Sequence, residues 1–255
     1  MKVYLINLDK DVDRLRGADS QLKRLDVEYE RFPAVYAKTL DEEILEQAVD
    51  KFRWWCVLGR PVSLGEIGCA LSHYSLYERI IKDDEPACIL EDDVALDARF
   101  KEMLEFAGSE IQCARPQVIL LSNHTRCKGG SQKELVRCTA DMFAEGYLIT
   151  PIAAKVLLSA NMPMQCPCDH WGRWVKVGLI ELYHAFPTVC SQNVKSFESN
   201  TTGGRMRVTV ANLGVIGWTC HKFKRIIGKT IDWVLCYLPS SIGKACGYGR
   251  SAKGF

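Results

Sequence analysis

The chain has 255 residues, with 33 lysine and arginine residues against 31 aspartate and glutamate residues. This length suits one catalytic-sized domain with a short appendage. The balanced charge provides no broad positive field, which argues against nucleic acid as a partner and leaves electrostatic function to local clusters.

The N-terminus and the cysteines indicate the compartment. The apolar run in MKVYLINLDKD is too short for a signal-peptide core or a membrane span. The twelve cysteines are scattered through apolar segments, which favours reduced, buried thiols over a disulfide framework. We therefore expect a cytoplasmic protein.

The first sixty residues predict two strands and two helices. VYLINL is typical of a buried parallel strand, which ends at residues 7–9, and a charged helix follows to about Asp26. We expect a second strand near residues 29–34 and a polar helix at residues 40–50. The aromatic-rich KFRWWCVLGRP is expected to form a loop.

SLGE at residues 63–66 is a strong helix start, because Ser63 and Glu66 can form a capping box. The helix is expected to run to about Lys82. Small residues spaced three or four apart leave one face nearly bare, for close packing or for a ligand phosphate or sugar. These residues are Gly65, Gly68, Cys69 and Ser72.

The following segments alternate between strands and helices. Strands are expected at ACIL, QVILLS and GYLIT, and helices are expected from Asp97 and from Thr150–Pro151 to about Asn161. The first of these helices carries an apolar stripe of Phe100, Met103, Leu104 and Ala107. This alternation predicts an α/β fold with a mainly parallel sheet that helices cover on both faces. In such sheets, ligands bind at the carboxyl ends of the strands.

The stretch CILEDDVAL ends an apolar strand with Glu91, Asp92 and Asp93. If these residues continue the strand, Glu91 and Asp93 point to one face and Asp92 to the other. Two carboxylates on one face suit Mn²⁺ or Mg²⁺, which complete their shell with water and substrate phosphates. The alternative is a solvated acidic turn.

An ordered set of segments over roughly residues 1–200 resembles glycosyltransferase family 25. This family contains lipopolysaccharide and lipooligosaccharide biosynthesis enzymes, with collagen galactosyltransferases as relatives. The segments are VYLINLDKDVDRL, SLGEIGCALSHYSLYERI, ILEDDV, EGYLITPIAAKVLL, CPCD and SQNVKS. The resemblance implies a GT-A-type nucleotide-diphospho-sugar transferase fold at residues 1–210 and a UDP-sugar donor, often UDP-galactose.

The resemblance also implies roles for the acids. Glu91 and Asp93 would bind Mn²⁺ or Mg²⁺, and Glu91 and Asp92 would form part of the donor site. Asn7, Asp9 and Arg14 lie just past the first strand, where a nucleotide would contact the sheet edge. The forked guanidinium group of Arg14 suits a diphosphate, and the alternative is a surface ion pair with a nearby aspartate.

Two further residues are candidate catalytic groups. The resemblance places His73 near the active site, to contact the donor or to hold the acidic loop; the alternative is a hydrogen-bonded core histidine. Asp169 ends a P-x-D motif of the family and would act as general base on the acceptor hydroxyl, or bind the acceptor. Its alternative role is an N-cap for the HWGRWVKV helix. The spacing of Cys166 and Cys168 is tighter than that of usual zinc motifs.

Residues 211–255 predict a basic amphipathic tail. Apolar residues at helical spacing alternate with lysine and arginine, and Trp218 and Trp233 would sit at an interface. We expect this tail to associate with the cytoplasmic face of the inner membrane without crossing it. The alternative is a helix packed on the domain or on a partner chain.

The sequence thus predicts an inverting, metal-dependent enzyme that moves a hexose, with galactose expected, from a UDP-sugar to a lipooligosaccharide or lipopolysaccharide acceptor. One rival is a UDP-sugar hydrolase or nucleotidyltransferase, which would use the same acids on the same diphosphate. A second rival is a non-enzymatic membrane adaptor, which would show no metal dependence.

Overall fold

The computed structural model describes residues 1–124, 129–193, 226–228 and 230–231. The chain divides into two compact units. The first unit comprises residues 1–50 and 62–205, and the second comprises residues 51–61 and 206–255. The expected boundary at residue 210 and most of the predicted tail lie outside the described residues.

A seven-stranded sheet forms the centre of the first unit, in the order β2-β1-β3-β7-β5-β8-β6. β1 is parallel to β2 and β3, and β5 is parallel to β8. β7 is antiparallel to β3 and β5, and β6 is antiparallel to β8. The strands are β1 (Lys2–Asn7), β2 (Glu30–Pro33), β3 (Ala87–Glu91), β5 (Gln117–Leu120), β6 (Glu134–Cys138), β7 (Gly146–Ile149) and β8 (Glu181–Phe186).

The sheet is therefore mixed, and the prediction of a mainly parallel sheet was wrong. A parallel connection needs a long crossover, usually through a helix. Between β5 and β7 the described residues contain no helix, and here the regular strand-helix alternation stops. β7 then enters the sheet between β3 and β5 in the reverse direction.

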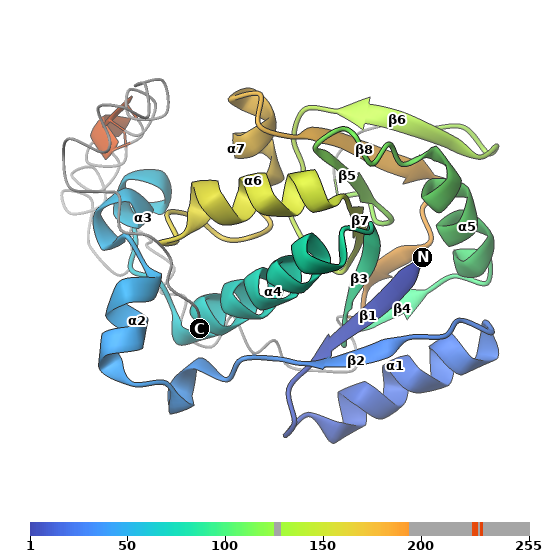
Figure 1. Cartoon of the computed structure of the whole chain (residues 1–255), viewed down its shortest axis with the longest axis horizontal. Coiled ribbons are helices and arrows are strands. Elements are labelled where there is room, and N and C mark those ends of the chain that lie inside the picture. Colours follow the sequence, from blue (N-terminus) through green and yellow to red (C-terminus); the bar gives the residue numbers. More distant parts are fainter. Residues whose placement is uncertain (125–128, 194–225, 229, 232–255) are drawn as a thin grey trace, which may run out of the picture. The chain divides into compact units, whose positions relative to one another are not determined.

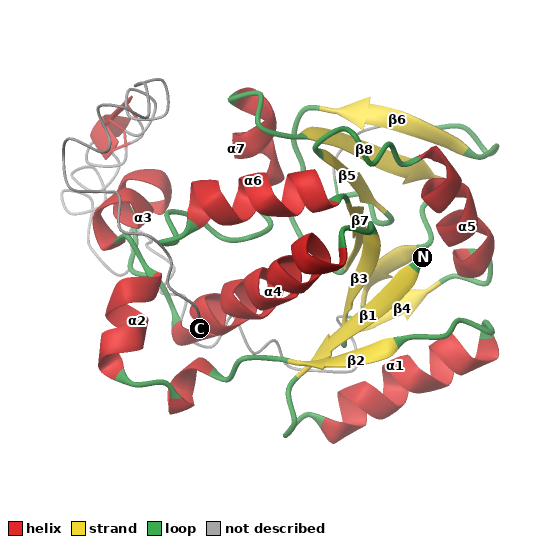
Figure 2. Cartoon of the chain, viewed as in Figure 1, coloured by secondary structure: helices red, strands yellow, loops and turns green. Residues whose placement is uncertain are grey.

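Helices cover both faces of this sheet (Figures 1 and 2). α1 and α5 contribute to the apolar cluster on one face, whereas α4 packs beside α6 on the other. The helices of this unit are α1 (Val12–Arg24), the short 3-10 helix η1 (Ala37–Thr39), α2 (Glu42–Ala48), α4 (Leu64–Asp83), α5 (Phe100–Glu110), α6 (Pro151–Asn161) and α7 (Trp171–Lys176). The expected helices of this unit are all present, although α5 begins three residues after Asp97.

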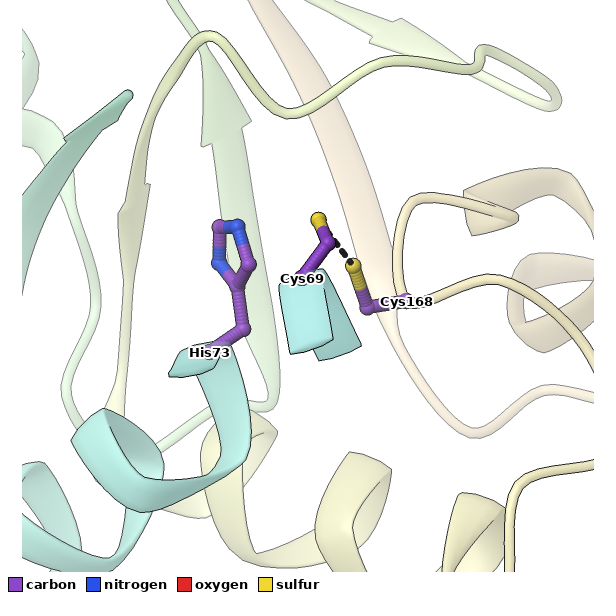
Figure 3. Close-up of side chains that lie close together, drawn as sticks. All are labelled: Cys69, His73 and Cys168. Atoms are coloured by element: carbon purple, nitrogen blue, oxygen red, sulfur yellow. Dashed lines mark hydrogen bonds between the residues drawn. The ribbon is translucent and has the colours of Figure 1, made fainter. Parts of the chain in front are cut away.

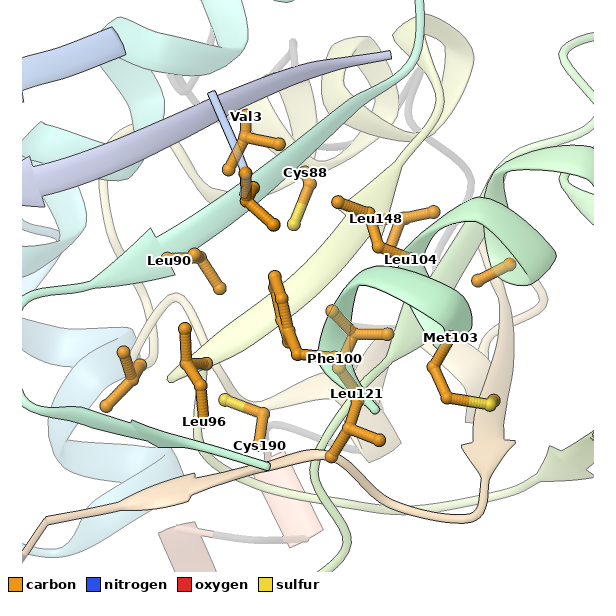
Figure 4. Close-up of a cluster of buried hydrophobic side chains, with 14 of the residues drawn as sticks. Val3, Cys88, Leu90, Leu96, Phe100, Met103, Leu104, Leu121, Leu148 and Cys190 are labelled. Atoms are coloured by element: carbon orange, nitrogen blue, oxygen red, sulfur yellow. The ribbon is translucent and has the colours of Figure 1, made fainter. Parts of the chain in front are cut away.

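The apolar core beneath α5 follows the predicted stripe. Phe100, Met103, Leu104 and Ala107 are all buried and pack against the strands, together with side chains such as Leu90 (Figure 4). A helix with one apolar stripe buries that stripe against the sheet and leaves its other side to solvent.

A second, two-stranded sheet begins directly after the acidic residues 91–93. β4 (Val94–Leu96) pairs antiparallel with β9 (Cys190–Gln192). Val94 lies opposite Gln192, so the end of β9 is held next to the acids that precede β4. This pairing brings the SQN segment, far away in the sequence, to the acidic stretch.

The second unit contains α3 (Lys51–Leu58), so the loop expected for KFRWWCVLGRP was wrong. The segment has neither glycine nor proline before Gly59, which has a φ of +68° and follows the helix end. Residues 226–228 and 230–231 are helical, with Ile226, Ile227 and Ile231 exposed. Among the described residues, no helix is long and apolar enough to cross a membrane.

Candidate active site at the carboxyl ends of two strands

A pocket lies at the carboxyl ends of β1 and β3 in the first unit. It encloses about 900 Å³ of space, including part that is open to solvent. Its lining comes from the β1–α1 junction, residues 34–38, the first half of α4, the acids at 91–93 and Gln192. Its place agrees with the expected location of ligands in an α/β sheet.

The capping box at the start of α4 is confirmed. The hydroxyl of Ser63 accepts a hydrogen bond from the Glu66 amide at 3.3 Å, and the Glu66 carboxylate accepts one from the Ser63 amide at 3.0 Å. Both bonds satisfy amides that the first helical turn would leave unpaired. The helix start is therefore well defined, and α4 presents its small residues and His73 to the pocket.

The bare face of α4 packs directly on backbone. A β-carbon at Gly68 would lie only 2.6 Å from the carbonyl oxygen of Val35, so a glycine is required for this close approach. The hydroxyl of Ser72 accepts a hydrogen bond from the Val35 amide at 2.8 Å and donates one to the Gly68 carbonyl at 2.6 Å. All three residues line the pocket, so the close packing also shapes its wall.

Asp92 is held by two residues from the β1–α1 region. Asn7 Nδ2 donates to Asp92 Oδ2 at 2.7 Å, and Arg14 Nη1 donates to Asp92 Oδ1 at 3.0 Å. Burial raises the pKa of Asp92, although both contacts favour its charged form. The structure thus brings three of the predicted site residues together, and both carboxylate oxygens of Asp92 are engaged.

Asp93 lies beside this cluster with one oxygen unused. Its Oδ2 accepts a hydrogen bond from Gln192 at 3.2 Å and lies 3.6 Å from Arg14 Nη1. Its Oδ1 is buried and has no hydrogen-bond partner among the residues that the structure describes. A buried carboxylate oxygen without a partner is costly unless it binds something positive.

The expected alternation of the three acids was wrong. β3 ends at Glu91, and Asp92 and Asp93 form the turn that leads into β4. A turn can direct successive side chains to one side, whereas a strand cannot. Glu91, Asp92 and Asp93 consequently all line the same pocket.

His73 contacts Glu91, the first of the three acids. Its Nε2 lies 3.2 Å from Glu91 Oε1, and its Nδ1 lies 2.7 Å from the hydroxyl of Tyr147. Burial would lower the pKa of His73, but Cys69 and Glu91 raise it to about 10. Burial raises the pKa of Glu91, whereas the contact with His73 acts to lower it. His73 is thus both a buried hydrogen-bonded histidine and a residue that holds the acidic segment, two roles that the sequence had left as alternatives.

Two predicted site residues lie outside the pocket lining. Asp9 is exposed and forms an ion pair with Arg31, which also donates to the side chain of Asn7. Asp169 accepts a hydrogen bond from the Phe143 amide at 3.0 Å. It does not cap α7, since the N-cap position is occupied by His170.

The tryptophans that follow Asp169 are core residues. Trp171 and Trp174 are buried, and the indole nitrogen of Trp171 donates to the carbonyl of Phe143 at 2.8 Å. A spacing of three on a helix is compatible with core packing or with stacking on a sugar. The burial favours core packing.

Sequence reasoning missed several residues of the lining. Lys10 lies 4.9 Å from the centre of the Tyr36 ring, and both border the pocket together with Lys38. Gln192 is also in the lining, and the SQN motif was the only signal for it. The two lysines add positive charge to the lining.

The fold and this pocket define a class: an α/β protein with a pocket at the carboxyl edge of its sheet that is lined by both carboxylates and cationic side chains. The comparison with protein families specifies it further. Residues 1–171 match Glycosyltransferase family 25 (LPS biosynthesis protein). The chain belongs to glycosyltransferase family 25.

Curated relatives agree with this membership. The chain is 27% identical over 171 residues to a glycosyltransferase 25 family member of Anopheles gambiae, a match that covers 61% of this chain and 28% of the relative. It is 29% identical over 177 residues to procollagen galactosyltransferase 1-A of Xenopus laevis, covering 63% of this chain and 28% of the relative. It is 31% identical over 177 residues to procollagen galactosyltransferase 2 of Homo sapiens, with the same two coverages of 63% and 28%. The match therefore spans little more than a quarter of each relative.

Proposed function

We propose that the chain is a GT-A-type, inverting glycosyltransferase that moves galactose from UDP-galactose to a lipooligosaccharide or lipopolysaccharide acceptor. The observation that carries this proposal is the buried, unpartnered Oδ1 of Asp93 in a pocket at the carboxyl ends of β1 and β3. Family membership supports sugar transfer as the chemistry.

The acidic residues fit a divalent cation such as Mn²⁺ or Mg²⁺. Asp93 offers an unused oxygen, and Glu91 borders the same pocket. Hard oxygen donors of this kind, completed by substrate phosphates, are what these ions prefer. Both oxygens of Asp92 are already bonded, so Asp92 holds the site together and Asp93 and Glu91 are the proposed ligands. When bound, the cation would neutralise charge on the departing UDP.

The cationic residues would bind and orient the donor diphosphate. Lys10 and Lys38 border the pocket, and Arg14 reaches it while bonded to Asp92. Fixed positive groups in a partly enclosed site stabilise negative charge that develops on a leaving group. Asn7 and Arg14 would act mainly by keeping the Asp92–Asp93 turn in place. Asp9, which lies outside the lining, could contact only a part of the donor that extends beyond the pocket.

Asp169 is the proposed general base. Its carboxylate bonds the amide of Phe143, a residue with a φ of +80° and a 41% exposed side chain. Such a strained, exposed aromatic residue next to a carboxylate suits a place where an acceptor sugar would pack. Asp169 would take the proton from the acceptor hydroxyl as the new glycosidic bond forms.

The relatives, the family description and the tail sequence support the proposed donor sugar, acceptor and location. Two relatives are named procollagen galactosyltransferases, which favours galactose, and the family description names LPS biosynthesis, which favours that acceptor. The basic amphipathic pattern of residues 211–255 supports peripheral association with the cytoplasmic face of the inner membrane. Cosedimentation of the chain with anionic vesicles, compared with a chain that ends at residue 210, tests the association.

UDP release tests the proposed reaction. The chain is incubated with a panel of UDP-sugars and Mn²⁺, with and without a lipooligosaccharide acceptor, and with EDTA as a control. We expect release from UDP-galactose that the acceptor stimulates and EDTA abolishes. Release that ignores the acceptor would establish a hydrolase instead, and a lack of release from every donor would contradict the proposal.

A further inference from the structure

Three side chains that the proposed reaction does not use converge beside Glu91. Cys69 and His73 lie one turn apart on the same face of α4, and Cys168 reaches them from the loop between α6 and α7 (Figure 3). Metal-binding side chains are those of histidine, cysteine, aspartate and glutamate. Within the part of the chain that the structure describes, this is the one group of three or more of them whose donor atoms all lie within 4.8 Å of one another. Cys168 and His73 are buried, and Cys69 is partly buried.

We propose that Cys69, His73 and Cys168 bind a Zn²⁺-type ion at a site separate from that of the donor cation. Zinc prefers thiolate and imidazole ligands, and two cysteines with one histidine can hold it while water takes the fourth position. The cysteine spacing within the CPCD motif had argued against zinc. In the structure, the candidate ligands instead come from two segments that are far apart in the sequence, α4 and the loop between α6 and α7.

The distance between the two sulfurs matches tetrahedral coordination. Two sulfurs that each lie about 2.3 Å from a tetrahedral zinc ion are about 3.8 Å apart. The Sγ atoms of Cys69 and Cys168 are 3.8 Å apart. The donor nitrogen of His73 lies within 4.8 Å of both sulfurs.

The surroundings of His73 support a ligand role for its Nε2. Metal-binding histidines usually use their second ring nitrogen for a hydrogen bond that fixes the tautomer. His73 Nδ1 lies 2.7 Å from the Tyr147 hydroxyl, which lies 2.9 Å from the hydroxyl of Tyr77. Binding of the ion would displace the proton of Nε2, so that Nε2 holds the ion while Nδ1 donates to Tyr147.

The two sites would select different ions. The proposed site has two sulfur ligands and one imidazole, whereas Asp93 and its neighbours offer oxygen and amide groups. The zinc-type ion would join α4 to the loop that carries Cys168. Because Asp169 follows Cys168 directly, the ion would also fix the position of the proposed general base. The site itself does not depend on the proposed reaction.

Cobalt substitution tests the site in the reduced, full-length chain. We expect one equivalent of Co²⁺ to give intense visible bands of tetrahedral cobalt and a near-ultraviolet thiolate-to-cobalt band, and Zn²⁺ to displace both. Cys69→Ser and Cys168→Ser should lose the thiolate band. Cys166→Ser removes a buried thiol two residues away and should keep it, as should Asp93→Asn at the donor-cation site.

Zinc content of the wild-type chain, measured by mass spectrometry after expression in zinc-supplemented medium, gives a readout that needs no variant. About one zinc per chain is expected. A wild type that binds neither zinc nor cobalt through thiolates, a Cys168→Ser variant that keeps the thiolate band, or a Cys69–Cys168 disulfide in protein handled under reducing conditions would overturn the proposal. A cobalt site without UDP release would count against the proposed reaction alone.

Discussion

Glu91 and Asp93 border the same pocket only two residues apart, yet their surroundings differ in kind. Asp93 faces Arg14 and Gln192 and keeps one buried oxygen without a partner. Glu91 faces an imidazole and a thiol, with His73 Nε2 at 3.2 Å and Cys69 Sγ at 3.9 Å. The turn after β3 thus divides one acidic stretch between an oxygen-rich side and a sulfur-containing side.

This difference shows how neighbouring carboxylates can have separate roles. Like charges placed close together repel, and each must be compensated locally. Asp92 is compensated by a guanidinium group and Glu91 by a histidine, while Asp93 retains capacity for a cation. The oxygen-rich side should therefore control the donor reaction, and the sulfur-containing side should control the architecture around it.

The largest expected effect comes from Asp93→Ala on the oxygen-rich side. Loss of the unpartnered oxygen should lower Mn²⁺-dependent UDP release by more than about 100-fold, because a bound cation contributes several kcal/mol of charge stabilisation. The matched control is Asp97→Ala, outside the pocket, whose activity should stay near that of the wild type. Equal activities of the two variants would show that Asp93 does not hold the cation.

Arg14→Met should have the next largest effect, which is a loss of stability. It leaves Asp92 and Asp93 without their buried cationic partner, and breaking such a pair costs about 3 to 5 kcal/mol of unfolding free energy. Urea denaturation measures the loss, and Asp92→Asn in the same chain should recover part of it. Arg16→Met, which breaks an exposed pair with Asp13, should cost under about 1 kcal/mol. Similar losses in both arginine variants would contradict the compensation argument.

Tyr147→Phe tests the support of His73 on the sulfur-containing side. It removes a buried hydroxyl that bonds His73 Nδ1 and Tyr77, and the buried nitrogen left unpaired should cost about 1 to 3 kcal/mol. Tyr183→Phe is the control, since its hydroxyl lies 3.4 Å from Glu181 in a half-buried place. Denaturation that does not distinguish the two variants would mean that His73 needs no support from Tyr147.

Ser63→Ala should have the smallest effect, about 1 kcal/mol of unfolding free energy, since an N-cap side chain is lost. The variant tests whether the start of α4, the helix that carries Cys69 and His73, depends on its capping box. Ser109→Ala, at an exposed hydroxyl, should change stability by less than about 0.5 kcal/mol. A Ser63→Ala variant as stable as Ser109→Ala would show that packing alone defines the helix start.

Local sequence signals predicted the helices and strands that depend on local chemistry. The capping box at Ser63 and Glu66, the Thr150 cap with Pro151, and the buried stripe from Phe100 to Ala107 are confirmed. Each depends on residues within one or two turns of the chain. The short range of these interactions is the reason that the sequence alone was sufficient.

Features that depend on distant pairing were not predictable in the same way. The direction of β7 is set by its neighbours β3 and β5, and the position of Gln192 by the pairing of β4 with β9. Cys69 and Cys168 lie 99 positions apart, so no spacing rule could have paired them. The residues at 92–93 form a turn rather than a strand, because the sequence pattern of three acids does not fix the backbone conformation.

The contact at Gly68 has a consequence for how the pocket can change over evolution. There the wall consists of main chain on main chain, since a β-carbon would come within 2.6 Å of the Val35 carbonyl. Side chains around the rim can be exchanged, but the width at this point cannot be adjusted by residue choice. Gly68 thus fixes the width of the pocket here, and a change in ligand preference would have to come from residues at the rim.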